Sequence, residues 1–313
     1  MQTREILIPG SLIKPDRLEI EITKRCPLKC IHCSTGLAQA KFGNELPLGD
    51  IIRVITEFSE LGGKTISVTG GEPFLKGPSS VLEIIKAAKN CSLVTSVYTS
   101  GYLLDETLAR KLHETEVDLV CISLEGIEKT HDMITGVDGS FEKACLALRL
   151  LKDYEVPTRV HFTPMRINYG EFQIVVHTGK SLGAKSIKIF EFSPQGRARE
   201  NKRRLELATE EIREFASSAV SIANRAGLTI QIGGLITELS SSCSIGRKIA
   251  ITCEGNALPC LGLQERIGSF GNFGNILLEP LTEIWKKIAK ATSERVCLCK
   301  ALREYPLENC AYP

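Results

Sequence analysis

A regular alternation of short apolar strands with amphipathic helices most constrains what this chain can fold into. The first predicted strand covers residues 18–23 and the first helix residues 48–61, where apolar side chains recur at helical spacing and Gly62-Gly63 ends the helix. Further strands are predicted at residues 64–69, 93–99, 117–123, 158–163 and 185–191, and further helices at 79–90, 105–114, 140–152 and 171–182. Strands interleaved with helices favour right-handed βαβ units. We therefore expect an α/β fold, a partial parallel (β/α)6 barrel.

The polar and glycine-containing segments of this region all follow predicted strands. In a parallel barrel, the loops at the carboxyl ends of the strands meet at one rim and carry the chemistry. In strand order, these segments are residues 26–33, 70–73, 99–101, 123–126, Arg166 with Asn168, and 196–198. The sequence thus predicts a single functional rim.

Composition excludes several classes of protein. The hydrophobic and charged fractions, 43% and 24%, are those of an ordinary globular chain. A net charge of +2 gives no general attraction to nucleic acid or to a membrane surface. No segment resembles a signal peptide or reaches the roughly 18 apolar residues of a membrane span. We expect a cytoplasmic protein without nucleic-acid or membrane partners.

The twelve cysteines are unusual for such a chain, because a reducing compartment disfavours a disulfide framework. Three of them crowd the first rim segment, and six crowd the last quarter of the chain: Cys243, Cys253, Cys260, Cys297, Cys299 and Cys310. The remaining three, Cys91, Cys121 and Cys145, lie in apolar surroundings and are predicted to be small core residues.

Cys26, Cys30 and Cys33 form a CxxxCxxC motif directly after the first strand. Three thiolates on one short loop can hold three corners of an iron-sulfur cube and leave the fourth iron without a protein ligand. A zinc site that recruits His32 and a disulfide are the alternatives. The predicted catalytic metal ligands are Cys26, Cys30 and Cys33.

The second rim segment is Gly70-Gly71-Glu72-Pro73. Glycines allow close approach of the backbone to a ligand, a carboxylate accepts a hydrogen bond from an ammonium group, and proline stiffens the exit. A plain turn would explain the glycines and the proline equally well. Together with CxxxCxxC one strand earlier, however, this segment resembles the GGEP motif of the radical S-adenosylmethionine (SAM) superfamily, which holds the methionine amine of SAM.

Further rim segments resemble the same superfamily less closely. Ser123-Leu124-Glu125-Gly126 resembles an S-x-D-G segment that contacts the ribose of SAM, with glutamate in place of aspartate, and Thr99-Ser100-Gly101 resembles T-N-G. Asn168 and Arg197 resemble positions that engage SAM or order its pocket, although a helix cap and a solvated arginine are alternatives. The predicted cofactor-binding set is Gly70, Gly71, Glu72, Pro73, Ser100, Ser123, Glu125, Arg166, Asn168 and Arg197.

A run from His131 to Phe141 resembles an H-D-x-x-x-G-x-x-G-S-F segment common in the same branch. We interpret it as structural, with Ser140 as the N-cap of the next helix and Phe141 as its hydrophobic staple. The alternative is that His131 faces the substrate.

The last quarter resembles a SPASM domain, an auxiliary-cluster module. Cys243, Gly255 and Cys260 have the spacing of its start, and residues 248–252 and 257–259 are predicted to form a hairpin that turns at residues 253–256. Two auxiliary clusters would need eight thiolates, so six cysteines favour one cluster, as in the shortened twitch domain. The resemblance implies ligands from Cys243, Cys260 and two of Cys297, Cys299 and Cys310, and a structural zinc site is the alternative. The expected domains are residues 1–235, the barrel, and 236–313, the auxiliary iron-sulfur domain.

The resemblance also implies an activity. A [4Fe-4S] cluster would bind SAM, receive an electron from a donor such as flavodoxin or ferredoxin, and cleave SAM to a 5′-deoxyadenosyl radical that removes hydrogen from the substrate. The auxiliary [4Fe-4S] cluster would accept the product electron or position the substrate.

The SPASM resemblance favours oxidative modification of a peptide or protein side chain as the reaction. The few residues before the first strand leave no room for a fused domain that recognises a leader peptide, so a separate partner would supply it. Dehydrogenation or rearrangement of a small alcohol, sugar or cofactor precursor is the alternative, and a non-enzymatic metal-binding scaffold is a remote one.

Overall fold

A curved nine-stranded sheet with helices on its convex side organises the computed structural model, which describes residues 14–34, 45–233, 246–262 and 273–293. The strand order is β7-β6-β5-β4-β3-β2-β1-β8-β9, and all neighbours are parallel except the antiparallel pair β8 and β9. The strands are β1 Arg17–Glu21, β2 Thr65–Thr69, β3 Val94–Thr99, β4 Leu119–Ser123, β5 Thr158–Phe162, β6 Ser186–Ile189, β7 Thr229–Ile232, β8 Lys248–Ile251 and β9 Ala257–Leu258.

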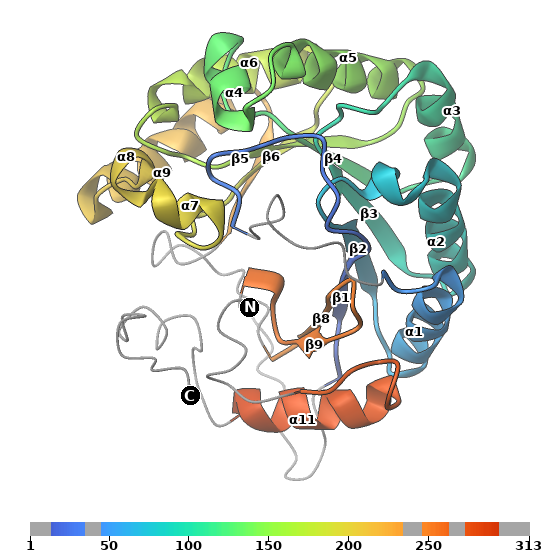
Figure 1. Cartoon of the computed structure of the whole chain (residues 1–313). Coiled ribbons are helices and arrows are strands. Elements are labelled where there is room, and N and C mark those ends of the chain that lie inside the picture. Colours follow the sequence, from blue (N-terminus) through green and yellow to red (C-terminus); the bar gives the residue numbers. More distant parts are fainter. Residues whose placement is uncertain (1–13, 35–44, 234–245, 263–272, 294–313) are drawn as a thin grey trace, which may run out of the picture.

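The helices follow the strands around the outside of this arc, which stays open on one side (Figure 1). They are α1 Leu48–Glu60, α2 Pro78–Asn90, α3 Glu106–Glu114, α4 Lys129–Thr135, α5 Ser140–Asp153, α6 Phe172–Ser181, α7 Arg197–Glu200, α8 Lys202–Leu205, α9 Thr209–Arg225 and α11 Leu281–Ser293, with short 3-10 helices at Pro73–Lys76 and Tyr169–Glu171. The predicted partial barrel of six parallel strands is confirmed.

The sheet extends beyond the six predicted barrel strands at both edges. At one edge β7 pairs with β6, and at the other β8 runs parallel to β1, with Leu18 opposite Ile249 and Ile20 opposite Ile251. Because β8 also pairs with β9, the hairpin predicted in the last quarter forms, and its first strand belongs to the same sheet as the barrel. The expected boundary between residues 235 and 236 lies outside the described ranges and stays a prediction.

Side-chain alternation gives the sheet two different faces. Leu18, Ile20, Val68 and Val97 are buried against the helices as members of one large apolar core. Because successive side chains of a strand point to opposite faces, the residues between them point to the concave side. Burial of the apolar face stabilises the barrel by about 25 cal/mol for each Å² of apolar surface removed from water.

The C-terminal helix α11 is fastened to the first helix of the barrel. The Leu281 amide, at the start of α11, donates to the Glu57 carboxylate at 2.6 Å, and Arg53 donates to the Ile276 carbonyl at 2.7 Å. A carboxylate at a helix N-terminus satisfies an otherwise unpaired amide and complements the helix dipole. These contacts join the last described segment to α1.

Asp132, rather than Ser140, caps helix α5, so the predicted N-cap is wrong. The N-cap residue is Gly139, and the Asp132 carboxylate accepts hydrogen bonds from the Gly139 and Phe141 amides and from the Ser140 hydroxyl, at 2.7 to 2.8 Å. Partial burial disfavours ionisation, but these hydrogen bonds outweigh it and hold the pKa of Asp132 below its usual value.

We expect Asp132→Asn to lower the free energy of unfolding by about 1 kcal/mol at pH 7, the usual size of a lost cap. Because the folded-state pKa is depressed, the carboxylate stabilises the fold above its unfolded pKa of about 3.9, and this stabilisation is lost as the pH falls through the folded pKa. Urea unfolding midpoints at pH 7 and pH 3.5 measure both effects. Asp138→Asn, in the same loop but exposed, is the control, and equal midpoints for the two variants would contradict the cap.

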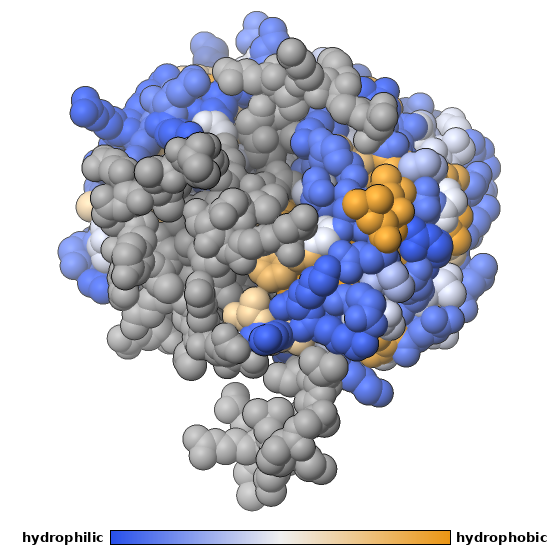
Figure 2. All heavy atoms as spheres, turned by 60° about the horizontal axis from the view of Figure 1, so that its bottom comes forward, coloured by the Kyte–Doolittle hydropathy of each residue, from blue (hydrophilic) through white to orange (hydrophobic). Residues whose placement is uncertain are grey.

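The surface is mainly hydrophilic in the described part of the face shown in Figure 2, with a compact apolar patch among the polar side chains. The most exposed large apolar side chain of the described ranges is Leu278, which is 86% exposed. No helix within those ranges combines the length and the apolar character needed to cross a bilayer.

Candidate active site

The loop that carries the three cysteines follows β1 and is held from two sides. On one side, the Lys29 and Ile31 amides donate at 2.8 Å to carbonyls at the end of α4. On the other, the Arg197 guanidinium donates to the Cys30 carbonyl at 2.8 Å, and the Asn201 amide group donates to the Ile31 carbonyl at 3.1 Å. Main-chain contacts to α4 and side chains from α7 and the residue after it therefore fix the path of the loop.

The three cysteines of this loop are half-buried. Burial raises the pKa of Cys26 to about 11, and the negative charges of Glu72 and Cys33 add to the shift. Burial, followed by the neighbouring thiols Cys26 and Cys33, likewise raises the pKa of Cys30. Such thiols ionise when a metal cation replaces the proton, which is how cysteine becomes a ligand.

The spacing of these thiols is too wide for a preformed single-ion site. Among the described histidine, cysteine, aspartate and glutamate residues, only Glu21, Cys253 and Glu254 have ligand atoms that all lie within 4.8 Å of one another. The sulfur atoms of the cysteine loop therefore do not all lie within that distance. Nε2 of His32, the fourth zinc ligand of the alternative interpretation, lies 3.4 Å from Oε1 of Glu125 instead. A cube of four irons is larger than one ion, so the geometry fits the cluster better than zinc.

Gly70 and Gly71 bring the second rim segment directly onto the cysteine loop. The Gly71 amide donates to the Thr23 carbonyl at 2.8 Å, and the Glu72 amide donates to the Arg25 carbonyl at 2.8 Å. A Cβ atom on Gly70 would lie 2.5 Å from the Thr23 oxygen, and one on Gly71 would lie 2.3 Å from the Arg25 oxygen. The glycines are thus needed for contact between two backbone segments, whereas the motif predicted a close approach of the backbone to a ligand.

Glu72 is completely buried between these segments. Its carboxylate accepts hydrogen bonds from the Thr99 hydroxyl at 2.6 Å and from the Ser100 amide at 2.9 Å, and also from the Ser100 hydroxyl. Burial raises the pKa of Glu72, and these hydrogen bonds only partly oppose the shift. Within the described part of the chain its donors are neutral, so the site offers a buried acceptor that a cation would complement.

Glu125 ties the cysteine loop to the ends of β4 and β5. Its carboxylate faces His32 and accepts from the Thr163 amide at 2.7 Å, and its own amide donates to Nδ1 of His131 at 3.0 Å. Burial lowers the pKa of His131 to about 4, so this imidazole is neutral at pH 7 and Nε2 carries its proton. The structural interpretation of His131 agrees with these contacts.

Asn168 has both ends of its side chain bound by main chain. Its oxygen accepts from the Met165 amide at 2.6 Å, and its nitrogen donates to the Glu125 and Thr163 carbonyls at 2.7 and 3.0 Å. Asn168 therefore orders the loops around Glu125, which is one of the two roles that the resemblance implies for it.

Arg166 is the predicted cofactor residue that the structure does not bring into this group. Its exposed guanidinium pairs with Glu211 of α9 at 3.2 Å and donates to the Glu206 carbonyl at 3.1 Å. Ser123 ends β4 opposite His161, next to the Glu125 loop, and Pro73 begins the 3-10 helix after Glu72. Cofactor contacts for all three stay predictions.

Two described cysteines of the last quarter lie beside β1. Cys260 accepts a hydrogen bond at 3.2 Å from Lys248, which also pairs with Glu19 at 2.9 Å. Cys253 is buried next to Glu21, and its amide lies 3.5 Å from the Glu21 carboxylate. The other predicted auxiliary ligands, Cys243, Cys297, Cys299 and Cys310, lie outside the described residues.

Sequence reasoning missed several residues that build the site. Arg25 forms a forked pair with Glu45 at 3.0 and 3.1 Å, and Thr23 also donates to Glu45. Thr99 holds Glu72 as closely as the predicted Ser100 does. Arg25 follows the first strand and directly precedes Cys26. This position on the rim was the one sequence signal that could have identified it as a site residue.

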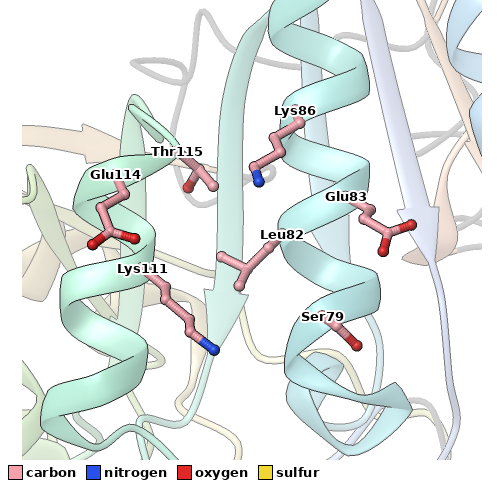
Figure 3. A pocket seen from close by; sticks show the side chains of 7 residues that line it. All are labelled: Ser79, Leu82, Glu83, Lys86, Lys111, Glu114 and Thr115. Carbon is pink, nitrogen blue, oxygen red and sulfur yellow. The ribbon is translucent and has the colours of Figure 1, made fainter.

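The structure also has a cavity of about 260 Å³ between α2 and α3, on the convex side of the sheet (Figure 3). Its lining mixes both charges, with Glu83 and Lys86 from one helix and Lys111 and Glu114 from the other. It contains none of the predicted site residues, so the candidate active site remains the rim at the carboxyl ends of the strands.

The donor set of this rim fits an iron-sulfur cluster and SAM. Cys26, Cys30 and Cys33 offer three thiols on one restrained loop. Glu72 offers a buried carboxylate on the neighbouring segment, which contacts that loop through main-chain hydrogen bonds. Three sulfur ligands suit iron, and a buried acceptor suits an ammonium group.

Comparison with known proteins finds chains of similar sequence and fold. The PqqA peptide cyclase of Granulibacter bethesdensis is 28% identical over 280 residues, which are 87% of this chain and 74% of the relative. Streptococcus suis SuiB bound to S-adenosylmethionine shares the fold with a TM-score of 0.73 and 17% identity, over 87% of this chain and 65% of SuiB. The structure of anSMEcpe with bound AdoMet and the Cp18Cys peptide has a TM-score of 0.71 and 20% identity, over 93% and 86% of the two chains.

A family model provides the direct assignment. The sequence pattern of the radical SAM superfamily matches residues 20–176, which run from β1 into α6 and include both the cysteine loop and Glu72. This range covers half of the chain. The chain therefore belongs to the radical SAM superfamily of enzymes.

Proposed function

We propose that this protein is a radical SAM enzyme that oxidatively modifies a side chain of a peptide or protein. The observation that carries the proposal is the direct contact between the three-thiol loop and the segment that buries Glu72. The peptide substrate is inferred from the relatives, because one is named a PqqA peptide cyclase and another was solved with a peptide.

Each residue of the rim has a defined task in this proposal. Cys26, Cys30 and Cys33 would hold the [4Fe-4S] cluster, and Glu72 would accept a hydrogen bond from the ammonium group of SAM. When bound, the cluster and SAM supply the one-electron chemistry and the hydrogen abstraction. Arg197 keeps the cysteine loop in position through the Cys30 carbonyl.

The other residues of the predicted cofactor-binding set fall into two groups. Gly70, Gly71 and Pro73 shape the segment that presents Glu72, while Ser100 orients its carboxylate. Ser123, Glu125, Asn168 and Arg166 remain predicted contacts of SAM or of its pocket. A cytoplasmic location and an electron donor such as flavodoxin or ferredoxin also remain predictions.

The proposal is tested on anaerobically reconstituted protein. We expect about eight irons per chain, four for each of two clusters, and release of 5′-deoxyadenosine when dithionite and SAM are added. Measurements are iron analysis, the spectrum of the reduced protein with and without SAM, and chromatography of the products. A reconstituted chain that binds no more than one metal ion and releases no 5′-deoxyadenosine would exclude the enzyme and favour the zinc alternative.

The auxiliary cluster has its own prediction at Cys260, the predicted ligand that the structure describes. Replacing Cys260 with alanine is expected to reduce bound iron from about eight to about four per chain, because one cube loses a thiolate. Release of 5′-deoxyadenosine without substrate should persist, since the first cluster is untouched. Cys145→Ala on the outer helix α5 is the control, and undiminished iron in Cys260→Ala would remove Cys260 from the ligand set.

A further inference from the structure

The concave face of the barrel is polar, unlike the interior of an ordinary parallel barrel. Small barrels fill this space with branched apolar side chains. Here the residues that alternate with the buried apolar ones are Glu19, Ser67, Ser96, Tyr98, Cys121, Arg159, His161 and Lys188, contributed by β1 to β6. A face of this kind has to be hydrated or has to bind a polar ligand, because unpaired polar groups are costly to bury.

Aromatic rings and cations adjoin each other on the β3 to β6 part of this face. The ring of His161 contacts Tyr98 and Phe190 edge-on, with centroids 4.8 Å apart in both cases, and Nζ of Lys188 lies 4.5 Å from the centroid of Phe190. His161 and Lys188 are directly opposite each other in the pairing of β5 with β6. Arg159, two residues before His161, points to the same side and donates to Ser186 at 3.0 Å.

The charges of this group do not balance. Lys248 and Glu19 pair at 2.9 Å, whereas no carboxylate oxygen of the described residues lies within 4.0 Å of the Arg159 or Lys188 nitrogens. Burial lowers the pKa of Lys188, and Glu19 only partly opposes the shift. Burial and the two nearby cations, Lys188 and Arg159, hold the pKa of His161 well below its usual value, so this imidazole is neutral.

His161 provides the second, independent observation. Its side chain is buried, and Nε2 has no hydrogen-bond partner among the described residues. A buried nitrogen without a partner costs free energy unless a ligand or a water molecule satisfies it. This nitrogen belongs to the same aromatic and cationic group.

The group is placed directly below the candidate active site. Thr163, two residues after His161, donates to Glu125, which faces His32 of the cysteine loop. Two residues of a strand span about 7 Å. His161 therefore lies two residues before Thr163, which contacts the Glu125 carboxylate that faces the cysteine loop.

We propose that Lys188, Arg159 and His161 form a subsite that binds a carboxylate of the substrate. The proposal rests on the proposed function, since it assigns a chemical class to the substrate of that same site. Arginine and lysine form charge-assisted hydrogen bonds with a carboxylate, and the tautomer of neutral His161 that has its proton on the unpartnered Nε2 would add a neutral donor. The carboxylate belongs either to an acidic side chain within a peptide or to a free chain end.

Binding to the reconstituted full chain tests the subsite with defined probes. The peptides are Ac-Gly-Glu-Gly-NH₂, its glutamine analogue, and Ac-Gly-Gln-Gly with a free carboxyl end, titrated by calorimetry up to 10 mM. We expect one of the two acids to bind at least about tenfold more tightly than the fully neutral peptide, the value of one charge-assisted hydrogen bond. Tighter binding of the glutamate peptide would identify the carboxylate as that of an acidic side chain, and tighter binding of the peptide with a free carboxyl end would identify it as that of a chain end. Equal binding of all three, or none, would overturn the subsite.

Variants connect this preference to the proposed residues. Lys188→Met should reduce the preference for the acid by about tenfold, and Lys188→Arg should keep it. The control is Lys143→Met, an exposed lysine on the outside of α5. A preference for the acid that survives in Lys188→Met would also overturn the proposal. Release of 5′-deoxyadenosine without peptide, measured in the same preparations, tests the proposed function separately and should be unchanged in the control Lys143→Met.

Discussion

Replacing Cys26, Cys30 and Cys33 together with alanine is expected to abolish release of 5′-deoxyadenosine and to remove about four of eight bound irons. The loss should be complete, because no other thiol is available on this loop. The loop itself should keep its path, since main-chain contacts to α4 and the Arg197 side chain hold its carbonyls and amides.

The remaining iron makes this experiment informative. If the triple variant keeps about four irons, the protein has two separate metal centres, and only the one on the loop of Cys26, Cys30 and Cys33 cleaves SAM. The matched control replaces Cys91, Cys121 and Cys145, which lie outside both predicted ligand groups. Release of 5′-deoxyadenosine by the Cys26/Cys30/Cys33 variant at the rate of the unmodified chain would contradict the assignment of the cluster.

Glu72→Gln is expected to weaken SAM binding without lowering the stability of the protein. The carboxamide keeps the size of the side chain but loses its charge, so SAM should bind about 10- to 100-fold more weakly, as expected for the loss of a hydrogen bond between ions. The free energy of unfolding without SAM should not fall, because a buried carboxylate with a raised pKa and neutral donors is replaced by a neutral group.

Equilibrium dialysis with labelled SAM and urea unfolding measure the two effects on the same preparations. Glu114→Gln, the same change at an exposed position on α3, should alter neither. An unchanged dissociation constant for SAM in Glu72→Gln would show that the ammonium group binds elsewhere. A large loss of stability would instead make Glu72 a structural residue.

The sequence predicted the barrel and its rim well because both depend on local signals. Apolar segments of strand length and helices with one apolar face mark the βα units, and parallel pairing then brings the loops after the strands to one edge. Gly71 and Glu72 were predicted as site residues for the same reason, as a motif on one loop. The contact of these loops with residues 23 to 25 was not visible, because it joins two segments through their main chains.

Features that depend on distant partners could not be predicted. The strand of the hairpin, β8, has nothing in its four residues that selects β1 as its neighbour. Asp132 as the cap of α5 requires the close approach of α4, and Ser140 has the better local signal. Lys188 and His161 looked like ordinary members of alternating strands, and only the pairing of β5 with β6 brings them opposite each other on the concave face.

The parallel pairing of β1 with β8 has a consequence for how the chain folds. The strand that leads into the cysteine loop lies between β2, which follows it closely in sequence, and β8, which comes near the end of the chain. Pairing of such distant segments requires closure of a very long loop and is therefore slow. During synthesis, β1 has one neighbour until residues 248–251 have emerged from the ribosome. The strand before the cysteine loop therefore gains its second neighbour late, after the six barrel strands have been synthesised.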